Sequence, residues 1–115
     1  MHIEKYSFGT GDRFGKEGSA QLAALLEINR LGVPVAPVWN KSNREHAIIH
    51  TVPEDVTKEA AAAVAAAGYK GNFYVDADHI NLDTVDKFMT AINFFTIDVA
   101  HFIGKKADPD AIQGF

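Results

Sequence analysis

The sequence lacks cysteine, and no apolar stretch among its 115 residues approaches the ~20 residues that a membrane-spanning helix requires. The absence of cysteine excludes a disulfide framework and a thiolate metal site, and it is consistent with a reducing compartment. The opening residues, MHIEKYSF, also lack the long apolar segment of a signal peptide. We therefore expect a cytoplasmic protein that does not insert into a membrane.

Positive charge is also scarce. The chain has 11 Lys and Arg residues against 15 Asp and Glu residues, so its net charge is -4. This balance argues against broad electrostatic attachment to nucleic acid or to an anionic membrane. The composition, 47% hydrophobic and 23% charged, excludes disordered, collagen-like and coiled-coil classes and fits a single globular domain. Small molecules are the predicted partners.

What the sequence does contain is a regular alternation of strand and helix patterns. Apolar runs rich in β-branched and aromatic residues predict strands at residues 4–8, 33–40, 72–78 and 94–103. Helical spacing and capping signals predict helices at residues 18–31, 53–67 and 85–92. The resulting order, βαβαβαβ, predicts a parallel sheet with right-handed crossovers.

Local signals sharpen two of these elements. The residues from Thr51 to Glu54 match a capping box with Pro53 in the first turn, so a helix is expected to start there. Its small apolar residues are expected to form a thin stripe close to the sheet: Val56, Ala60, Val64 and Ala67. In the second strand, Pro34 and Pro37 each remove a hydrogen-bond donor, which predicts an edge strand or a local irregularity.

Two parallel architectures fit this order of elements. A doubly wound sheet would be complete in 115 residues, whereas a closed eight-stranded barrel needs about 250. The final residues, DPDAIQGF, resemble the start of another helix, with Asp108 at the cap and Pro109 in the first turn. This ending favours a chain that is part of a longer protein.

Polar side chains follow each predicted strand, at the edge where parallel α/β folds bind ligands. The candidates are Asp12 and Arg13 after the first strand, Asn40, Lys41 and Arg44 after the second, Asp76, Asp78 and His79 after the third, and Asp98 and His101 in the fourth. Ordinary loop polarity explains any one of these ends. Four polar ends together indicate one shared site.

The stretch YVDADHINLD carries the strongest signal. Alternation along a strand places Asp76 and Asp78 on one side, as it does Thr96 and Asp98 on the next strand. His79 follows Asp78 directly, and a carboxylate beside a neutral imidazole suits a divalent cation. The same pair is also a common surface arrangement, so the residues alone leave the metal site open.

Other motifs point to anion binding or to nothing specific. Arg13 can hold a carboxylate or phosphate in a two-pronged grip, with Lys41 and Arg44 as a second anionic grip, and surface ion pairs are the alternative. The glycines of GTGDRFG are spaced one residue too far apart for a dinucleotide-binding loop. His46 and His50 are interpreted as ordinary core or surface histidines.

Taken together, YSFGTGDRFG, PVWNKSNREH, YVDADHINLDTVD and FFTIDVAHFIG resemble the amino-terminal part of the tagaturonate epimerase family. These bacterial enzymes interconvert tagaturonate and fructuronate in hexuronate catabolism, and they are longer, metal-dependent proteins with a barrel-like α/β fold. The likeness spans essentially the whole chain. It implies that residues 1–115 form one α/β domain of about four βα units, the first half of a TIM-like (β/α) barrel, incomplete as a catalyst alone.

The resemblance also implies residue roles. By similarity, Asp78 is the catalytic proton acceptor and His79 binds a divalent metal cation, with further ligands and the proton donor beyond Phe115. The expected residues for binding a small sugar acid are Asp12, Arg13, Asn40, Lys41, Arg44 and Asp76. The alternatives are another barrel isomerase or aldolase, or a non-catalytic carbohydrate-binding or assembly module that pairs with another copy or with a missing carboxyl-terminal half.

Overall fold

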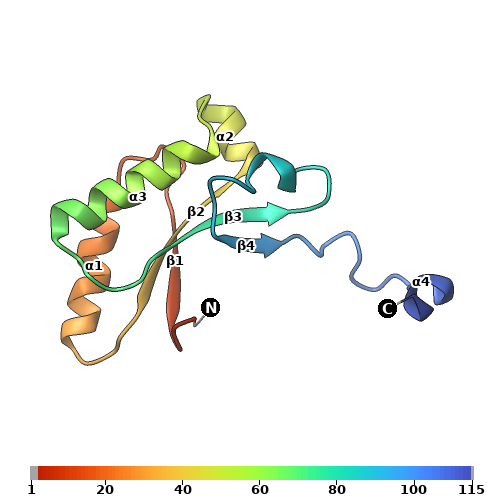
Figure 1. Cartoon of the computed structure of the whole chain (residues 1–115), viewed down its shortest axis with the longest axis horizontal. Helices are drawn as coiled ribbons and strands as arrows, with labels where there is room; N and C mark the ends of the chain where they lie inside the picture. Colours follow the sequence, from red (N-terminus) through yellow and green to blue (C-terminus); the bar gives the residue numbers. More distant parts are fainter. Residues whose placement is uncertain (1–2, 115) are drawn as a thin grey trace.

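The computed structural model describes residues 3–114 and contains one four-stranded sheet (Figure 1). Its strands are β1 (Ser7–Gly11), β2 (Ala36–Ser42), β3 (Tyr74–Ile80) and β4 (Phe94–Ile97). All three pairings are parallel, and the strands lie in the order β1-β2-β3-β4. Each strand therefore pairs with the next one along the chain, without the reversal of order that marks a doubly wound sheet. The predicted parallel α/β fold is confirmed.

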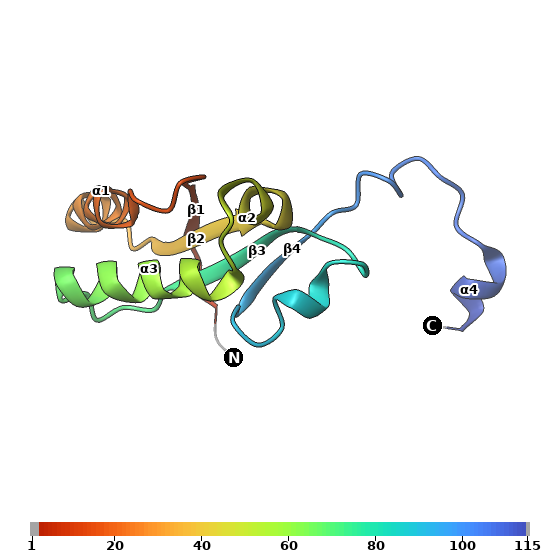
Figure 2. The same ribbon diagram turned by 90° about the horizontal axis from the view of Figure 1, so that it is seen from above.

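Helices connect the strands: α1 (Gly18–Arg30) lies between β1 and β2, α2 (Asn43–Ile49) and α3 (Pro53–Ala67) lie between β2 and β3, and the single 3-10 turn η1 (Val85–Lys87) lies between β3 and β4. A short helix, α4 (Pro109–Gln113), follows β4. The two long helices, α1 and α3, lie side by side and pack on β2 (Figure 2). No helix in the described range, residues 3–114, is both long and apolar enough to cross a membrane.

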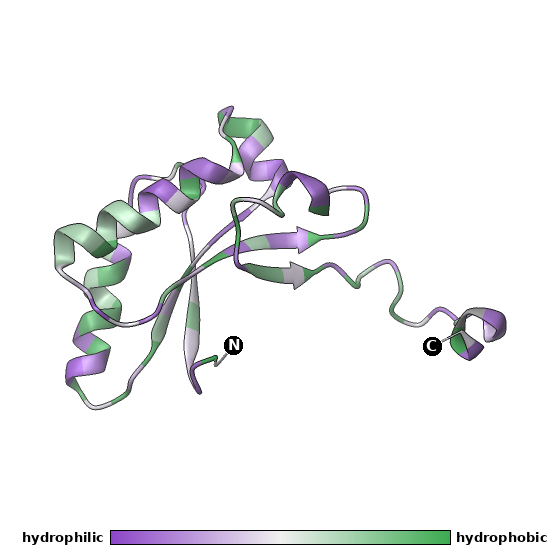
Figure 3. Ribbon diagram, in the orientation of Figure 1, coloured by the Kyte–Doolittle hydropathy of each residue, from purple (hydrophilic) through white to green (hydrophobic). Residues whose placement is uncertain are grey.

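The two faces of the sheet differ in what covers them. On the helix-covered face, Trp39, Val75 and Ala77 pack with buried residues of α1 and α3: Leu22, Val56, Ala60 and Ala63. The small residues of α3 let it lie close to the sheet, and Figure 3 shows this part of the helix as weakly hydrophobic. The opposite, open face carries a smaller apolar cluster formed entirely by strand residues: Ala36, Val38, Tyr74 and Phe94.

Strand β2 is not the edge strand that its prolines allowed, because β1 and β3 flank it on both sides. The N–H of Ala36 donates to the carbonyl of Tyr6, on the β1 side. Along a parallel strand successive residues bond to opposite neighbours, so the missing donor of Pro37 faces β3. Pairing with β3 begins only at Val38, opposite Tyr74, so Pro37 removes no hydrogen bond from the sheet.

The start of one helix is confirmed with a different cap, and one helix was missed. Helix α3 covers the predicted residues 53–67, but its cap residue is Val52, whose N–H donates to the carboxylate of Asp55, not Glu54, at 3.0 Å. Helix α2 was not predicted at all. It begins with a capping box in which Ser42 accepts the N–H of Glu45 and the Glu45 carboxylate accepts the N–H of Ser42.

The last part of the chain is less regular than predicted. The helix expected over residues 85–92 is only the single turn η1, because the N–H groups of Lys87, Phe88 and Ala91 bond three residues back and only that of Ile92 bonds four residues back. The fourth strand stops at Ile97 instead of residue 103, since Asp98 accepts the N–H of Ala100 and turns the chain. In both views the segment after β4 runs away from the sheet towards α4 (Figure 1 and Figure 2).

Candidate functional site

The carboxyl-terminal edge of the open face brings together polar side chains from three strands. Asn40 on β2 and Asp76 on β3 are register partners, so their side chains point to the same face. Thr96 on β4 donates its hydroxyl to Oδ2 of Asp76 at 2.7 Å. The prediction that adjacent strands present polar groups to one side of the sheet therefore holds for Asn40 and Asp76, with Thr96 as a third member.

Asp76 is the most constrained of these groups. It is only 4% exposed, and no described residue forms a hydrogen bond to its Oδ1. Burial raises the pKa of this carboxyl, the hydrogen bond from Thr96 opposes that effect, and the negative charge of Asp78 adds to it. An ionised carboxylate with one unsatisfied oxygen is unfavourable in such a place, so Asp76 is suited to accept a hydrogen bond from a ligand.

Asp78 and His79 form a pair at the end of β3. Nδ1 of His79 lies 2.9 Å from Oδ2 of Asp78, with the side chains 69% and 24% exposed, respectively. His79 has a left-handed backbone conformation, φ 57°, inside a register shift between Ala77 and Ile80. This bulge undoes the strict alternation that would separate neighbouring side chains. The two residues predicted to act together are therefore brought together.

Strand β1 contributes a bare strip of backbone to the open face. A Cβ added to Gly11 would lie 3.2 Å from Oδ1 of Asn40, and one added to Gly9 would lie 3.5 Å from its Nδ2. The Asn40 side chain thus lies across these two glycines. Its amide forms no hydrogen bond with any residue in the range 3–114, which leaves a donor and an acceptor for a ligand.

The loop after β1 is organised by Asp12. Its Oδ1 accepts the N–H of Phe14 at 2.9 Å, and its Oδ2 accepts those of Lys16 and Glu17, both at 2.6 Å. Partial burial raises the pKa of Asp12, but these hydrogen bonds and the charge of Lys41 outweigh that effect, so the pKa lies below its usual value. Asp12 is at the expected edge, with its carboxylate committed to the loop.

The predicted basic residues occupy two different sides of the sheet. The Arg13 and Arg44 side chains are exposed near the carboxyl-terminal edge. Lys41 is instead 3% exposed, and its Nζ donates to the carbonyl oxygens of Asp12 at 2.5 Å and Arg13 at 3.1 Å. Lys41 therefore departs from the prediction, because strand alternation places it on the helix-covered face, opposite Asn40.

The histidines of EHAIIH take the ordinary places expected of them. His46 is buried, with Nδ1 2.9 Å from Oγ1 of Thr51 and its ring packed against Phe88. Burial lowers the pKa of His46, and the charge of Lys41 lowers it further. His50 is exposed and ends α2 in a left-handed conformation. The two side chains do not form a shared metal site.

The residues at this edge of the sheet supply only some of the ligands that a metal cation requires. The paired geometry fixes Nδ1 of His79 against a carboxylate, an arrangement that orients the other imidazole nitrogen for a metal. The described residues contain no group of three or more His, Cys, Asp or Glu side chains that could hold an ion. His79 therefore fits the role of one ligand, and the pair alone does not complete a site.

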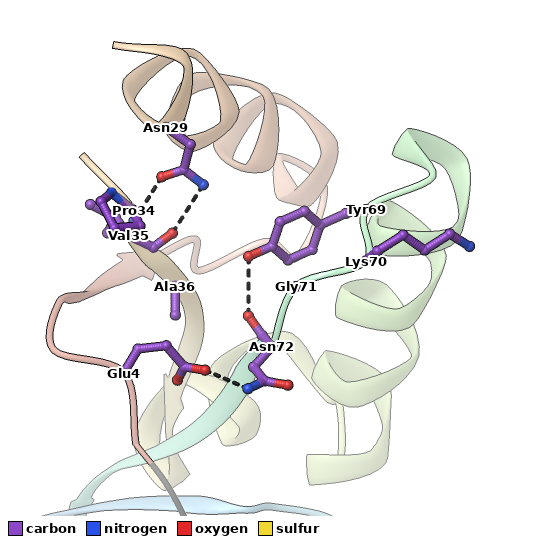
Figure 4. A pocket seen from close by; sticks show the side chains of 9 residues that line it. All are labelled: Glu4, Asn29, Pro34, Val35, Ala36, Tyr69, Lys70, Gly71 and Asn72. Carbon is purple, nitrogen blue, oxygen red and sulfur yellow. Dashed lines mark hydrogen bonds between the residues drawn. The ribbon is translucent and has the colours of Figure 1, made fainter. Parts of the chain in front are cut away.

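A separate hollow of about 350 Å³ lies at the opposite, amino-terminal end of the strands (Figure 4). Most of its polar groups already bind one another: Asn29 pairs with both backbone groups of Val35, and Glu4 binds Asn72 and the hydroxyl of Tyr74. Since its groups are paired and it lies away from Asp76 and Asp78, it is not the candidate site.

Comparison with known proteins decides the family. The tagaturonate epimerase family, UxaE, matches residues 1–113. The chain belongs to this family. The match covers nearly all of the sequence, and it includes the Asp76–Asp78–His79 stretch and the polar ends of β1 and β2.

Two solved structures support the fold. Both are fructuronate-tagaturonate epimerase UxaE from Cohnella laeviribosi, complexed with two glycerol molecules or with one. The first is 23% identical with a TM-score of 0.72 over 95% of this chain, and the second is 24% identical with a TM-score of 0.70 over 94%. This chain spans about 22% and 21% of those chains, respectively. No functionally curated protein gives a significant match.

In this member of the tagaturonate epimerase family, some residues of the candidate site were not identified from the sequence. Thr96 was expected beside Asp98, whereas its hydroxyl binds Asp76, and only the strand register shows this. Gly9 and Gly11 were noted only for a rejected nucleotide motif. Their position opposite Asn40 was accessible in principle, because alternation places both on the same face of β1.

Proposed function

We propose that this chain carries part of the active site of an epimerase that interconverts tagaturonate and fructuronate in hexuronate catabolism. The observation that carries the proposal is the Asp78–His79 pair, held 2.9 Å apart beside the buried Asp76 at the carboxyl-terminal edge of the sheet. Parallel α/β folds place catalytic groups at this edge. Membership of the tagaturonate epimerase family supports the choice of substrate.

The proposed architecture is the first half of a TIM-like (β/α) barrel within a longer protein. Its support is the strand order β1-β2-β3-β4, which is the order of neighbouring strands in a barrel wall. In such a barrel the open face becomes the interior. The cluster of Ala36, Val38, Tyr74 and Phe94 would then pack against residues of further strands.

The chemistry of the two sugar acids limits the mechanism. They differ at C4, whose hydrogen is not adjacent to the C2 ketone, so enolisation at C3 alone cannot invert C4. Cleavage of the C3–C4 bond in a retro-aldol step can do so. The C4 hydroxyl proton leaves, C4 becomes an aldehyde, and the bond electrons pass to an enolate spanning C3, C2 and the C2 oxygen. After the aldehyde rotates, C3 attacks its other face and the C4 oxygen regains a proton.

The residues of this chain have defined tasks in that reaction. Asp78 accepts the C4 hydroxyl proton, because its carboxylate is partly exposed and only one of its oxygens is paired with His79. Asp76 binds a substrate hydroxyl through its unpaired Oδ1, and Asn40 binds another through its side-chain amide, which lies across Gly9 and Gly11. Arg13, with Arg44 nearby along the same edge, holds the C6 carboxylate in place.

A divalent cation completes the proposal. His79 would supply its second imidazole nitrogen to the ion, with Asp78 holding the ring from the other side. When bound, the cation would supply Lewis-acid stabilisation of negative charge on the C2 oxygen. The remaining ligands would come from parts of the protein other than residues 3–114.

Replacement of Asp78 tests the function directly. In the full-length protein, Asp78→Asn should reduce turnover of tagaturonate by about 10²–10⁴-fold, because the amide cannot accept the C4 hydroxyl proton. Asp86→Asn is the matched control, since Asp86 is an exposed carboxylate of η1. Circular dichroism should show both variants folded. Full activity of Asp78→Asn would remove this residue from the mechanism.

A further inference from the structure

The buried ammonium group of Lys41 lies beneath the loop that carries Arg13. Its side chain leaves β2 on the helix-covered face, where Nζ donates to two consecutive loop carbonyls, those of Asp12 at 2.5 Å and Arg13 at 3.1 Å. A buried charge requires such acceptors. Consecutive carbonyls bound to one ammonium fix the backbone at the point where the Arg13 side chain departs.

Glu59 on α3 holds the other end of the same loop. Its Oε1 accepts the N–H of Gly18, the first residue of α1, at 3.0 Å. A Cβ on Gly18 would lie 2.8 Å from that oxygen, so only glycine allows this approach without a shift. Burial raises the pKa of Glu59 above its ordinary value and the charge of Asp12 adds to this effect, while the Gly18 hydrogen bond and the charge of Lys41 oppose it. Lys41 and Glu59 therefore bind the two ends of the loop from the same side.

The loop is closed from within by Asp12, whose carboxylate binds the N–H groups of three loop residues. The side chains of Asp12, Lys41 and Glu59 thus all form hydrogen bonds with backbone atoms of the loop or of its end at Gly18. Burial raises the pKa of Glu45 at the start of α2, but hydrogen bonds from Ser42 and the charges of Lys41 and Arg13 lower it below its usual value. The exposed Arg13 side chain therefore lies near the end of β2.

We propose that Lys41 is a positioning residue for substrate recognition: it fixes the backbone of Asp12 and Arg13 so that the Arg13 guanidinium meets the carboxylate of the sugar acid. The identity of the ligand rests on the function proposed above. The position of the loop does not. Lys41 acts through Arg13 and makes no direct contact with the substrate.

Lys41→Met in the full-length protein tests this proposal, because methionine fills similar space without donating hydrogen bonds. The matched control is Lys58→Met, which removes a 77% exposed lysine next to Glu59 in the sequence. Amide hydrogen exchange over residues 12–18 should become about tenfold faster in Lys41→Met and stay unchanged in Lys58→Met. If Lys41→Met does not fold, Lys41→Leu, which also lacks a donor, takes its place with the same expectation.

Steady-state kinetics separate positioning from general stability. Lys41→Met should raise KM for tagaturonate by about tenfold with a smaller change in kcat, because the carboxylate grip is loosened. The ketohexose that has the same configuration as tagaturonate lacks the carboxylate. Its kcat and KM should therefore be the same in Lys41→Met and in the unaltered protein. Unchanged loop exchange, or equal effects on both substrates, would overturn the proposal. If Lys41→Met speeds amide exchange in the loop but the unaltered protein does not act on tagaturonate, the anchoring role of Lys41 is supported and the epimerase function is refuted.

Discussion

The two faces of the sheet use polar residues in opposite ways. On the helix-covered face, Lys41 binds loop carbonyls, Glu59 binds the N–H of Gly18 and His46 binds Thr51. On the open face, Oδ1 of Asp76 and the amide of Asn40 have no partner among residues 3–114. Polar groups beneath the helices thus bind other parts of the chain, whereas polar groups on the open face remain available for a ligand.

The contrast changes how neighbouring residues of one strand are interpreted. Asn40 and Lys41 are adjacent and both were predicted to bind substrate, yet they point to opposite faces. Asn40 shares its face with Asp76, and Lys41 shares its face with Trp39. A lysine or arginine at the end of a strand is therefore a ligand-binding candidate only when strand alternation directs its side chain to the same face as the other site residues.

The largest expected effect tests whether the core covered by α1 and α3 carries the stability of the fold. Trp39 is 2% exposed in this core, whereas Phe8, which points to the same face from the outer strand β1, is 59% exposed. Trp39→Ala should lower the free energy of unfolding by about 3–5 kcal/mol, because it removes a large buried side chain. Phe8→Ala should change it by less than about 0.5 kcal/mol. Urea denaturation measures both, and equal losses would contradict the comparison.

Regular periodicity explains what could be predicted from the sequence. The alternation of strands and helices predicted the parallel order, and the two-residue period predicted that Asp76 shares one face of β3 with Asp78. The capping box of Ser42 and Glu45 was also present as a signal for α2, although it was not recognised. These features depend on residues close together in the chain, where local physical rules apply.

Contacts between distant residues could not be predicted in the same way. The bulge that joins Asp78 to His79 depends on how β3 pairs with β4, and the Thr96–Asp76 hydrogen bond depends on the same register. The role of Glu59 requires α3 to meet a glycine 41 positions earlier. Such contacts follow from tertiary packing, which overrides local preference.

The pH dependence of stability should differ between the two sets of buried groups, beginning with His46. Its pKa is lowered in the folded protein, so below its ordinary value of 6.5 the unfolded chain takes up a proton more readily than the native one. The free energy of unfolding should therefore fall as pH decreases from 7 to 5. His46→Asn should reduce this slope, whereas the same change at the exposed His50 should not. Chemical denaturation at several pH values measures the slope, and an unchanged slope in His46→Asn would refute this account.

Asp76 should show the opposite sign. Its folded pKa is raised above 3.8, so its unfavourable contribution is absent in acid, develops as pH rises through the folded pKa and is complete at neutral pH. Asp76→Asn, which stays neutral and can still accept the Thr96 hydroxyl, should increase the free energy of unfolding at pH 7 and lose that gain near pH 3.

The same Asp76→Asn change should weaken substrate binding, since the amide replaces a strong acceptor on the open face. Asp83→Asn, at an exposed carboxylate beyond the site, is the control for both measurements. A variant that is more stable but binds more weakly would mean that the buried carboxylate serves the ligand at the expense of the fold. Loss of stability at pH 7 would instead mean that Asp76, like Lys41, holds the structure together, and the difference between the two faces would disappear.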